Sequence, residues 1–256
     1  MSNHAIIIGI NNYTPIERQG LITLNGAIPD AESVHKWVTT RGGVDNDNAH
    51  LIISNEHQLT PVKDLIDDTI GEIINKVSAD GGVGDRFYFY FAGHGLGVEA
   101  DRENNGLCMA NWDENKRDSA ALSSADYKRK FVIEGLFKEI VVWLDCCRNP
   151  RIYFNPAGAG AVTPRPRNAN PKWMLAFGTQ YLNQAFETRG EARGIFTKVL
   201  LEGLDVNQGN GGAPVSVDDL RDYLSYKVPI EAQNAGYTQT PEVFSNVGGR
   251  LNNIYF

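Results

Sequence analysis

The sequence predicts an α/β fold in which a mostly parallel sheet carries helices on both faces. Two observations point to this fold: short, near-continuous apolar runs, and helical apolar patterns that alternate with them. Strands that are buried on both faces are typical of parallel sheets, and strand–helix alternation is typical of α/β folds. The 256 residues are 42% hydrophobic and 21% charged, a composition and length that allow one sizeable core.

The apolar runs predict six strands. The first is HAIIIGI at His4–Ile10, which stops at a polar Asn-Asn-Tyr sequence. The other predicted strands are Ala49–Ser54, Arg86–Ala92, Ile140–Cys146, Trp173–Phe177 and Pro241–Asn246. Each run is much shorter than the roughly 20 apolar residues that a membrane-spanning helix needs, so no span is predicted.

Four helices are predicted between these strands. Thr60 and Pro61 are expected to be the N-cap and first-turn proline of a helix that ends before Gly81. The other predicted helices are Pro29–Thr39, Gly194–Leu204 and one that starts at a Ser216–Asp219 capping box. Three long segments are predicted as loops: Gly97–Ser119, Arg148–Pro171 and Gln208–Pro214.

Charge and cysteine content restrict the partners and the compartment. Lys and Arg number 24 and Asp and Glu number 31, which gives a net charge of −7 and argues against a nucleic-acid partner. Three cysteines, two of them adjacent, argue against a disulfide framework and for a reducing compartment. With no signal-peptide pattern, we expect a cytoplasmic protein that needs no membrane; the oligomeric state is left open.

A histidine and a cysteine follow two of the predicted strands. The Arg86–Ala92 strand runs into His94 and Gly95, and the Ile140–Cys146 strand runs into Cys147. Ligands of open parallel sheets bind beyond the carboxyl ends of the strands. An imidazole and a thiol at that edge therefore predict nucleophilic catalysis, with the Gly95 amide as a candidate oxyanion donor.

Side-chain alternation favours Cys147 over its neighbour as the nucleophile. Along the strand Cys146 continues the fully apolar row, whereas Cys147 continues the row that carries Asp145. We therefore expect Cys146 to pack in the core and Cys147 to face the site. Cys108, in the polar segment, is expected to be a small packed side chain.

These segments resemble the caspase-like cysteine peptidases (clan CD, C14 type), closest to the bacterial metacaspase/orthocaspase branch. FYFAGHG at 89–95 is similar to the aromatic strand that leads into (S/A)-G-H-G, and DCC at 145–147 is similar to D-(S/C)-C. Further matching segments are AIIIGIN at 5–11, LNGA followed by DA at 24–31, and GIFT followed by LLEGL at 194–204. The resemblance implies a caspase-hemoglobinase-like α/β/α sandwich.

The resemblance also implies a role for each matching residue. His94 would be the general base and acid, Cys147 the nucleophile, and the Gly95 and Cys147 amides the oxyanion hole. Asp30 and Asp145 match positions of the family's S1 pocket, where two acids select Arg or Lys at P1 of a polypeptide substrate. For Asp30 a simpler interpretation is open, since an acid in the first turn favours the helix dipole.

The resemblance implies one peptidase domain over residues 1–256. Its parts would be a large-subunit-like portion at 1–147, a candidate processing loop at 148–172 and a small-subunit-like portion at 173–256. Arg151, Arg165 and Arg167 are candidate processing sites for self-cleavage or an upstream activating protease. The alternative is a loop that only shapes the substrate groove.

No cofactor and no metal site are expected. Four acids in the polar segment leave calcium open, although they lack EF-hand spacing: Asp101, Glu103, Asp113 and Glu114. Two functional alternatives also stay open, a catalytically silent scaffold or binding module and a CHAT- or separase-like protease with another P1 choice. A role in cell death or antiphage defence is a family-level analogy only.

Overall fold

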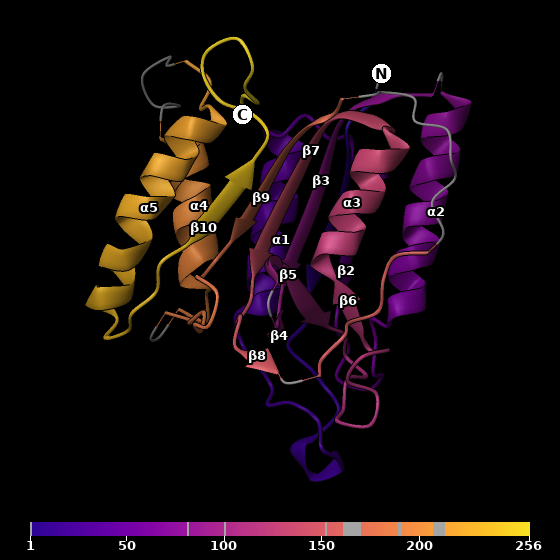
Figure 1. Cartoon of the computed structure of the whole chain (residues 1–256), viewed down its shortest axis with the longest axis vertical. Coiled ribbons are helices and arrows are strands. Elements are labelled where there is room, and N and C mark those ends of the chain that lie inside the picture. The colour runs from indigo at the N-terminus through magenta and orange to yellow at the C-terminus, as the bar shows by residue number, and fades with distance from the viewer. Residues whose placement is uncertain are drawn as a thin grey trace.

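The centre of the molecule is a six-stranded sheet in the order β10-β9-β7-β3-β1-β2 (Figure 1). The computed structural model describes residues 2–80, 82–99, 101–151, 153–160, 170–188, 191–206 and 213–256. The strands are β1 (His4–Gly9), β2 (Ala49–Ile53), β3 (Gly84–Ala92), β7 (Phe137–Asp145), β9 (Lys172–Phe177) and β10 (Glu242–Ser245). All pairs are parallel except β9 with β10, so the predicted mostly parallel sheet is confirmed.

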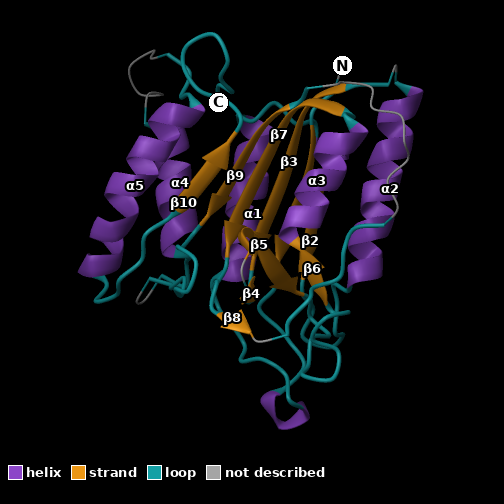
Figure 2. Cartoon of the chain, in the orientation of Figure 1, coloured by secondary structure: helices purple, strands orange, loops and turns teal. Residues whose placement is uncertain are grey.

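Helices cover both faces of this sheet (Figure 2). One face carries α2 (Lys63–Ala79) and α3 (Ser124–Glu134), and the other carries α1 (Ala27–Thr40), α4 (Ile195–Asp205) and α5 (Val217–Asn234). Within β1, Ile6 and Ile8 pack toward α2, whereas Ala5 and Ile7 pack toward α1. The two cores explain why this strand is apolar along its whole length.

A second sheet, of order β6-β5-β4-β8, corrects the prediction of a loop at Gly97–Ser119. Its strands are β4 (Gly95–Val98), β5 (Asp101–Cys108), β6 (Ala121–Ser123) and β8 (Pro150–Arg151). The polar composition of this segment suggested a solvent-exposed loop, but some of its polar side chains are buried and hydrogen-bonded to other parts of the protein. Asn105 of β5 is fully buried and donates to Cys146 Sγ at 3.1 Å and to Cys147 O at 3.0 Å.

Helix ends agree with the sequence in one case and differ in another. The Ser216–Asp219 capping box is present at the start of α5. The expected cap at Thr60 and Pro61 is wrong, because α2 begins at Lys63 after an extended Val62. The carbonyl of Pro61 instead accepts from Ala110 N at 3.0 Å, which keeps this segment out of the helix. The helix α3 and the 3-10 turns η1 (Ile16–Arg18) and η2 (Asn46–Asn48) were not predicted.

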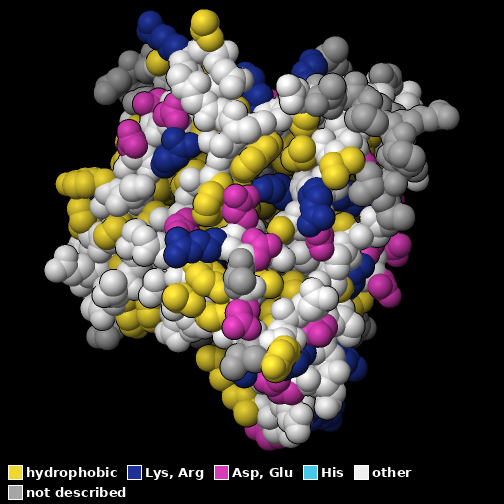
Figure 3. Space-filling model, in the orientation of Figure 1, with side chains coloured by type: hydrophobic (Ala, Val, Ile, Leu, Met, Phe, Trp, Pro, Cys, Tyr) yellow, Lys and Arg dark blue, Asp and Glu magenta, His cyan; other side chains and the backbone are white. Residues whose placement is uncertain are grey.

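One part of the sheet has less cover than the rest. No helix lies in front of β10 in Figure 1, and the surface there mixes apolar and charged side chains (Figure 3). The ammonium of Lys128 on α3 lies 4.1 Å from the ring centroid of Trp173 on β9.

Among the helices of the described segments, none has the length and apolar character to cross a bilayer.

Candidate active site

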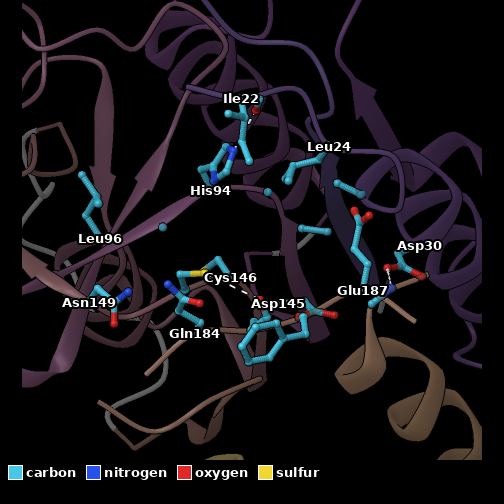
Figure 4. A pocket seen from close by; sticks show the side chains of 18 residues that line it. Ile22, Leu24, Asp30, His94, Leu96, Asp145, Cys146, Asn149, Gln184 and Glu187 are labelled. Atoms are coloured by element: carbon cyan, nitrogen blue, oxygen red, sulfur yellow. Dashed lines mark hydrogen bonds between the residues drawn. The ribbon is translucent and has the colours of Figure 1, made fainter. Parts of the chain in front are cut away.

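A pocket of about 360 Å³ opens beyond the carboxyl ends of β3 and β7, at the sheet edge that the sequence predicts (Figure 4). The four predicted side chains His94, Cys147, Asp30 and Asp145 all line this pocket. The predicted amide donor Gly95 lines it as well. The pocket walls also include residues that the sequence did not single out: Ile22, Leu24, Leu96, Asn149, Gln184, Ala185, Phe186 and Glu187.

The strand register brings the histidine and cysteine segments together. Ala92 at the end of β3 pairs with Asp145 at the end of β7, and Gly93 N donates to Asp145 O at 3.3 Å. Beyond the sheet, a Cβ on Gly95 would lie 2.6 Å from Cys147 O and 2.7 Å from Cys146 Sγ. Such a contact is too close for any side chain, so glycine at position 95 permits the two segments to touch.

The two adjacent cysteines have the environments that alternation predicts. Cys146 is 2% exposed, and its sulfur accepts the hydrogen bond from Asn105. Cys147 is half-buried, lines the pocket and donates from Sγ to Ala185 O at 3.7 Å. Burial raises the pKa of the Cys147 thiol, and the nearby charge of Asp145 adds to the rise. Cys108 is fully buried, as expected of a packed side chain.

The His94 imidazole is held on two sides, by Ile22 O (Figure 4) and by the Tyr13 ring. Its Nε2 lies 2.8 Å from Ile22 O, and a carbonyl can only accept, so Nε2 carries the proton and Nδ1 is the acceptor. Tyr13 packs against the ring with a centroid distance of 4.9 Å, and its Oη accepts from His94 N at 2.7 Å. Burial lowers the pKa of His94, so the imidazole is neutral at neutral pH.

The Gly95 amide points toward the Cys147 segment. Cys108 N donates to His94 O at 3.0 Å just before β4 begins, on the side that faces β5, while His94 N donates to Tyr13 Oη. Pairs alternate in an antiparallel ladder, so Gly95 and Leu107 form the non-bonded kind and the Gly95 amide faces away from β5. Two residues on, Gly97 N donates on that side to Asn149 O at 2.9 Å.

The segment after Cys147 is anchored by Arg148. Its guanidinium is fully buried and lies 3.7 Å from the Phe177 ring centroid. It donates to Thr179 O at 3.2 Å, to the Glu242 carboxylate and to Arg102 O. One side chain thus ties the loop after the nucleophile position to β5, β9 and β10.

Asp30 and Asp145 meet at Gly194 and form the acidic end of the pocket; in Figure 4 Asp30 lies to the right of His94, and Asp145 lies between Asp30 and Cys146. Asp30 accepts from Gly194 N at 2.6 Å, and Asp145 accepts from Thr197 N at 3.1 Å and Thr197 Oγ1 at 2.7 Å. A Cβ on Gly194 would lie 2.8 Å from Asp30 Oδ2 and closer still to Asp145 Oδ2. Burial raises the pKa of both carboxyls, and the Asp145 charge further raises the pKa of Asp30.

Sequence analysis missed two charged residues at this end. Glu187 lines the pocket and accepts from Gly26 N at 2.6 Å and Asn25 N at 3.2 Å, just before α1. Arg193 forms an ion pair with Asp30, with Nε at 2.7 Å from Oδ1. For Arg193 the available signal was its position directly before the GIFT segment, and Glu187 lies seven residues before that segment. No sequence signal pointed to Ile22, because its contact with His94 is made by the backbone carbonyl, which every residue has.

Of the candidate processing residues, Arg151 is described by the structure, and neither it nor the four candidate calcium residues line the pocket. Arg151 is exposed in β8 and lies 3.4 Å from Glu114, while Arg165 and Arg167 lie outside the described residues. Within the described ranges, no group of three or more His, Cys, Asp or Glu side chains could hold a metal ion. Glu103 instead pairs with Lys128 at 2.9 Å.

Comparison with known families decides which family the chain belongs to. A model of the caspase domain (Peptidase_C14) matches residues 2–251. The chain belongs to the caspase-domain peptidases. The family consists of cysteine peptidases, which agrees with the segment resemblance described above and with the α/β architecture.

Individual proteins resemble the chain over much of its length. A probable protease from a Desulfuromonadales bacterium is 29% identical over 240 residues, which are 88% of this chain and 28% of that protein. The chain thus spans little more than a quarter of this relative. A Geobacter sulfurreducens protein (TM-score 0.62, 15% identity) covers 98% of this caspase domain and is itself covered to 96%. Caspase-1 of Spodoptera frugiperda (TM-score 0.60, 13% identity) covers 94% and is covered to 85%. At these identities the two structures support the fold alone.

Proposed function

We propose that this caspase domain is a cysteine endopeptidase that cleaves after Arg or Lys. One observation carries the proposal: Asp30 and Asp145 flank Gly194 in the same pocket that holds Cys147 and His94. A buried carboxylate pair needs a cation, and a guanidinium or ammonium at P1 supplies one next to the sulfur. Glu187 adds a third acid to the wall of this S1 pocket.

In the proposed mechanism, His94 takes the proton of Cys147 only when the substrate is in place. Ile22 O fixes the Nε2–H tautomer, which leaves Nδ1 to accept the thiol proton as sulfur attacks the scissile carbonyl. The amides of Gly95 and Cys147 would donate to the resulting oxyanion. The imidazolium then protonates the leaving amine, and water hydrolyses the thioester by the same groups in reverse order.

We further propose that the chain is one peptidase domain that can be processed in its middle. The large-subunit-like part would be 1–147, the processing loop 148–172 and the small-subunit-like part 173–256. Arg151, Arg165 and Arg167 are the cleavage sites that an Arg-directed activity would recognise in that loop. A cytoplasmic location and a role in cell death or defence belong to this proposal as expectations.

A peptide library that varies only P1 tests the proposed specificity. We expect cleavage after Arg and Lys, little after Asp, and none by the Cys147→Ala variant. A flat profile or one that favours Asp would replace the basic specificity with that of another clan member of the CHAT or separase type. Absence of cleavage, together with failure of an arginyl chloromethyl ketone to label Cys147, would indicate a silent scaffold.

Intact mass tests the processing sites separately. Purified wild type should contain fragments that end at an arginine of residues 148–172, and Cys147→Ala should remain whole. The same comparison with and without calcium shows whether the metal alters processing. Fragments in both proteins would assign the cleavage to another protease.

A further inference from the structure

Arg193 stands at the rim of the acidic end of the pocket without lining the pocket itself. It directly precedes Gly194 and closes a turn in which Thr188 N donates to Arg193 O at 2.6 Å. Its Nε lies 2.7 Å from Asp30 Oδ1, while Asp30 Oδ2 accepts from Gly194 N. The side chain of Asp30 is 2% exposed and that of Arg193 is 29% exposed.

Arg193 approaches Asp30 from outside. It lines a separate shallow hollow with Ser33 and Lys198, whereas Asp30 lines the pocket that also holds Cys147. The carboxylate therefore lies between the guanidinium of this chain and the space where a P1 side chain would sit. Arg193 can act on P1 only through Asp30.

Burial raises the pKa of Asp30 to about 7, and this cation favours the ionised form. The other titratable groups that face it are acids or neutral: Asp145 at the end of β7, Tyr90 on β3 and Glu187 beside Asp145. Lys198 on α4 lies 3.3 Å from Glu191, and so is already paired. Burial and repulsion both favour the protonated form of Asp30, and the bonds from Gly194 N and Arg193 oppose them.

We propose that Arg193 is a positioning residue for substrate specificity, which orients the Asp30 carboxylate toward the P1 cation and favours its ionised form. The inference rests on the proposed function, and it assigns control of the Asp30 charge to a residue outside the pocket. Without Arg193, Asp30 keeps a proton at neutral pH, and the pocket offers P1 one negative charge fewer.

The expected consequence is a pH-dependent loss of substrate binding. In Arg193→Gln, the pKa of Asp30 rises further, so the acid limb of kcat/KM for a P1-Arg peptide moves to higher pH. Near pH 6.5 we expect KM to rise about tenfold, as for loss of one charge-assisted contact, with kcat within about twofold. The two proteins should converge by pH 9, where Asp30 is ionised in both.

The test compares Arg193→Gln with the charge-preserving Arg193→Lys between pH 6 and 9. Arg193→Lys should restore most of the binding, which a lost packing contact alone would not. In an Asp30→Asn background, Arg193→Gln should cause no further change, because its effect passes through Asp30. Circular dichroism and the thermal midpoint check that each variant is folded.

Two results would overturn the inference. A KM that is unchanged or lower in Arg193→Gln at every pH would show that Arg193 is irrelevant or competes with P1. A parallel loss of kcat in Arg193→Gln and Arg193→Lys, with no pH dependence, would indicate a structural role.

Benzamidine binding to the Cys147→Ala variant separates this inference from the proposed function. The probe carries a P1-like cation, and its binding by calorimetry needs no catalysis. If benzamidine fails to bind and no basic peptide is cleaved, the proposed function fails. If benzamidine binds equally to Cys147→Ala with and without Arg193→Gln across the pH range, only the role of Arg193 fails.

Discussion

The pocket has a reactive end, formed by His94 and Cys147, and an acidic end, formed by Asp30 and Asp145. Both ends are buried, but they differ in whether their side chains are stabilised in the charged form. At the reactive end burial lowers the pKa of His94 and raises that of Cys147, so both groups are neutral at rest. At the acidic end Asp145 and Asp30 receive hydrogen bonds from Thr197 and Gly194. Burial opposes charge at both ends, and at the acidic end the hydrogen bonds from Gly194 and Thr197 stabilise the carboxylates against it.

This difference suggests that the acidic end binds the substrate with groups that are already charged, whereas the reactive end becomes charged only during the reaction. The acidic end is organised before any substrate arrives, because its donors come from the start of α4 and from the residues just before it. The reactive end holds its two groups with the backbone carbonyls of Ile22 and Ala185 and creates charge only during the reaction. The predictions below test this comparison.

The largest effect is expected from Cys147→Ala. Loss of the nucleophile should lower kcat for a P1-Arg peptide by at least about 10⁴-fold, as for other enzymes that act through a covalent intermediate. Cys146→Ala is the matched control, since that sulfur is buried against Asn105 and should cost stability rather than chemistry. Equal losses of kcat in both variants would reject the assignment of Cys147 as the nucleophile, and with it the assignment of His94 and Cys147 as the reactive end.

The next largest effect is expected at the acidic end. Asp145→Asn keeps the shape of the side chain and an oxygen for Thr197, but removes the charge. We expect kcat/KM for P1-Arg to fall about 100-fold, mainly through KM, because a buried charge pair is lost. A P1-citrulline peptide, which is neutral, is the control substrate. A loss of the same size with both substrates would mean that Asp145 supports structure and not charge recognition.

The sequence located the site because its side chains follow strand ends. The pairing of Ala92 with Asp145 places the next residues of each strand at one edge, as parallel strands require. Alternation also separated Cys146 from Cys147, although β7 ends at Asp145 and the chain bends at Cys146. The apolar runs likewise predicted all six strands of the main sheet, and both faces of the central strands β1, β3 and β7 are buried over most of their length.

The remaining parts depend on groups that residue type does not reveal. The acceptor for His94 is the carbonyl of Ile22, and the anchor of the Cys147 loop is a buried arginine, a residue that is normally exposed. The second sheet was missed because its polar residues, such as Asn105, bond to the neighbouring segment instead of water. The link between Arg193 and Asp30 joins residues 163 positions apart.

A pH series of alkylation tests the uncharged reactive end. The pKa of Cys147 lies above its ordinary value of 9.0, so the thiolate, which is the reactive form, is scarce at pH 7. The iodoacetamide rate should increase about tenfold per pH unit between pH 7 and 9, and stay below that of free cysteine at pH 7. Cys147→Ala supplies the background rate. Fast, pH-independent alkylation at pH 6–7 would instead indicate a preformed thiolate–imidazolium pair.

The smallest effect is expected from Tyr13→Phe, which keeps the ring against His94 and removes the acceptor for His94 N. The backbone amide of His94 then loses its acceptor, while Ile22 O and the packed ring still contact the imidazole. We expect kcat to fall about fivefold, the equivalent of one modest hydrogen bond, with KM for P1-Arg unchanged. The imidazole shifts of His94 in an NMR titration should move, whereas Tyr127→Phe, distant on α3, should leave both readouts as in wild type. If KM rises and kcat is unchanged, Tyr13 serves the acidic end, and the two ends are less separate than the structure suggests.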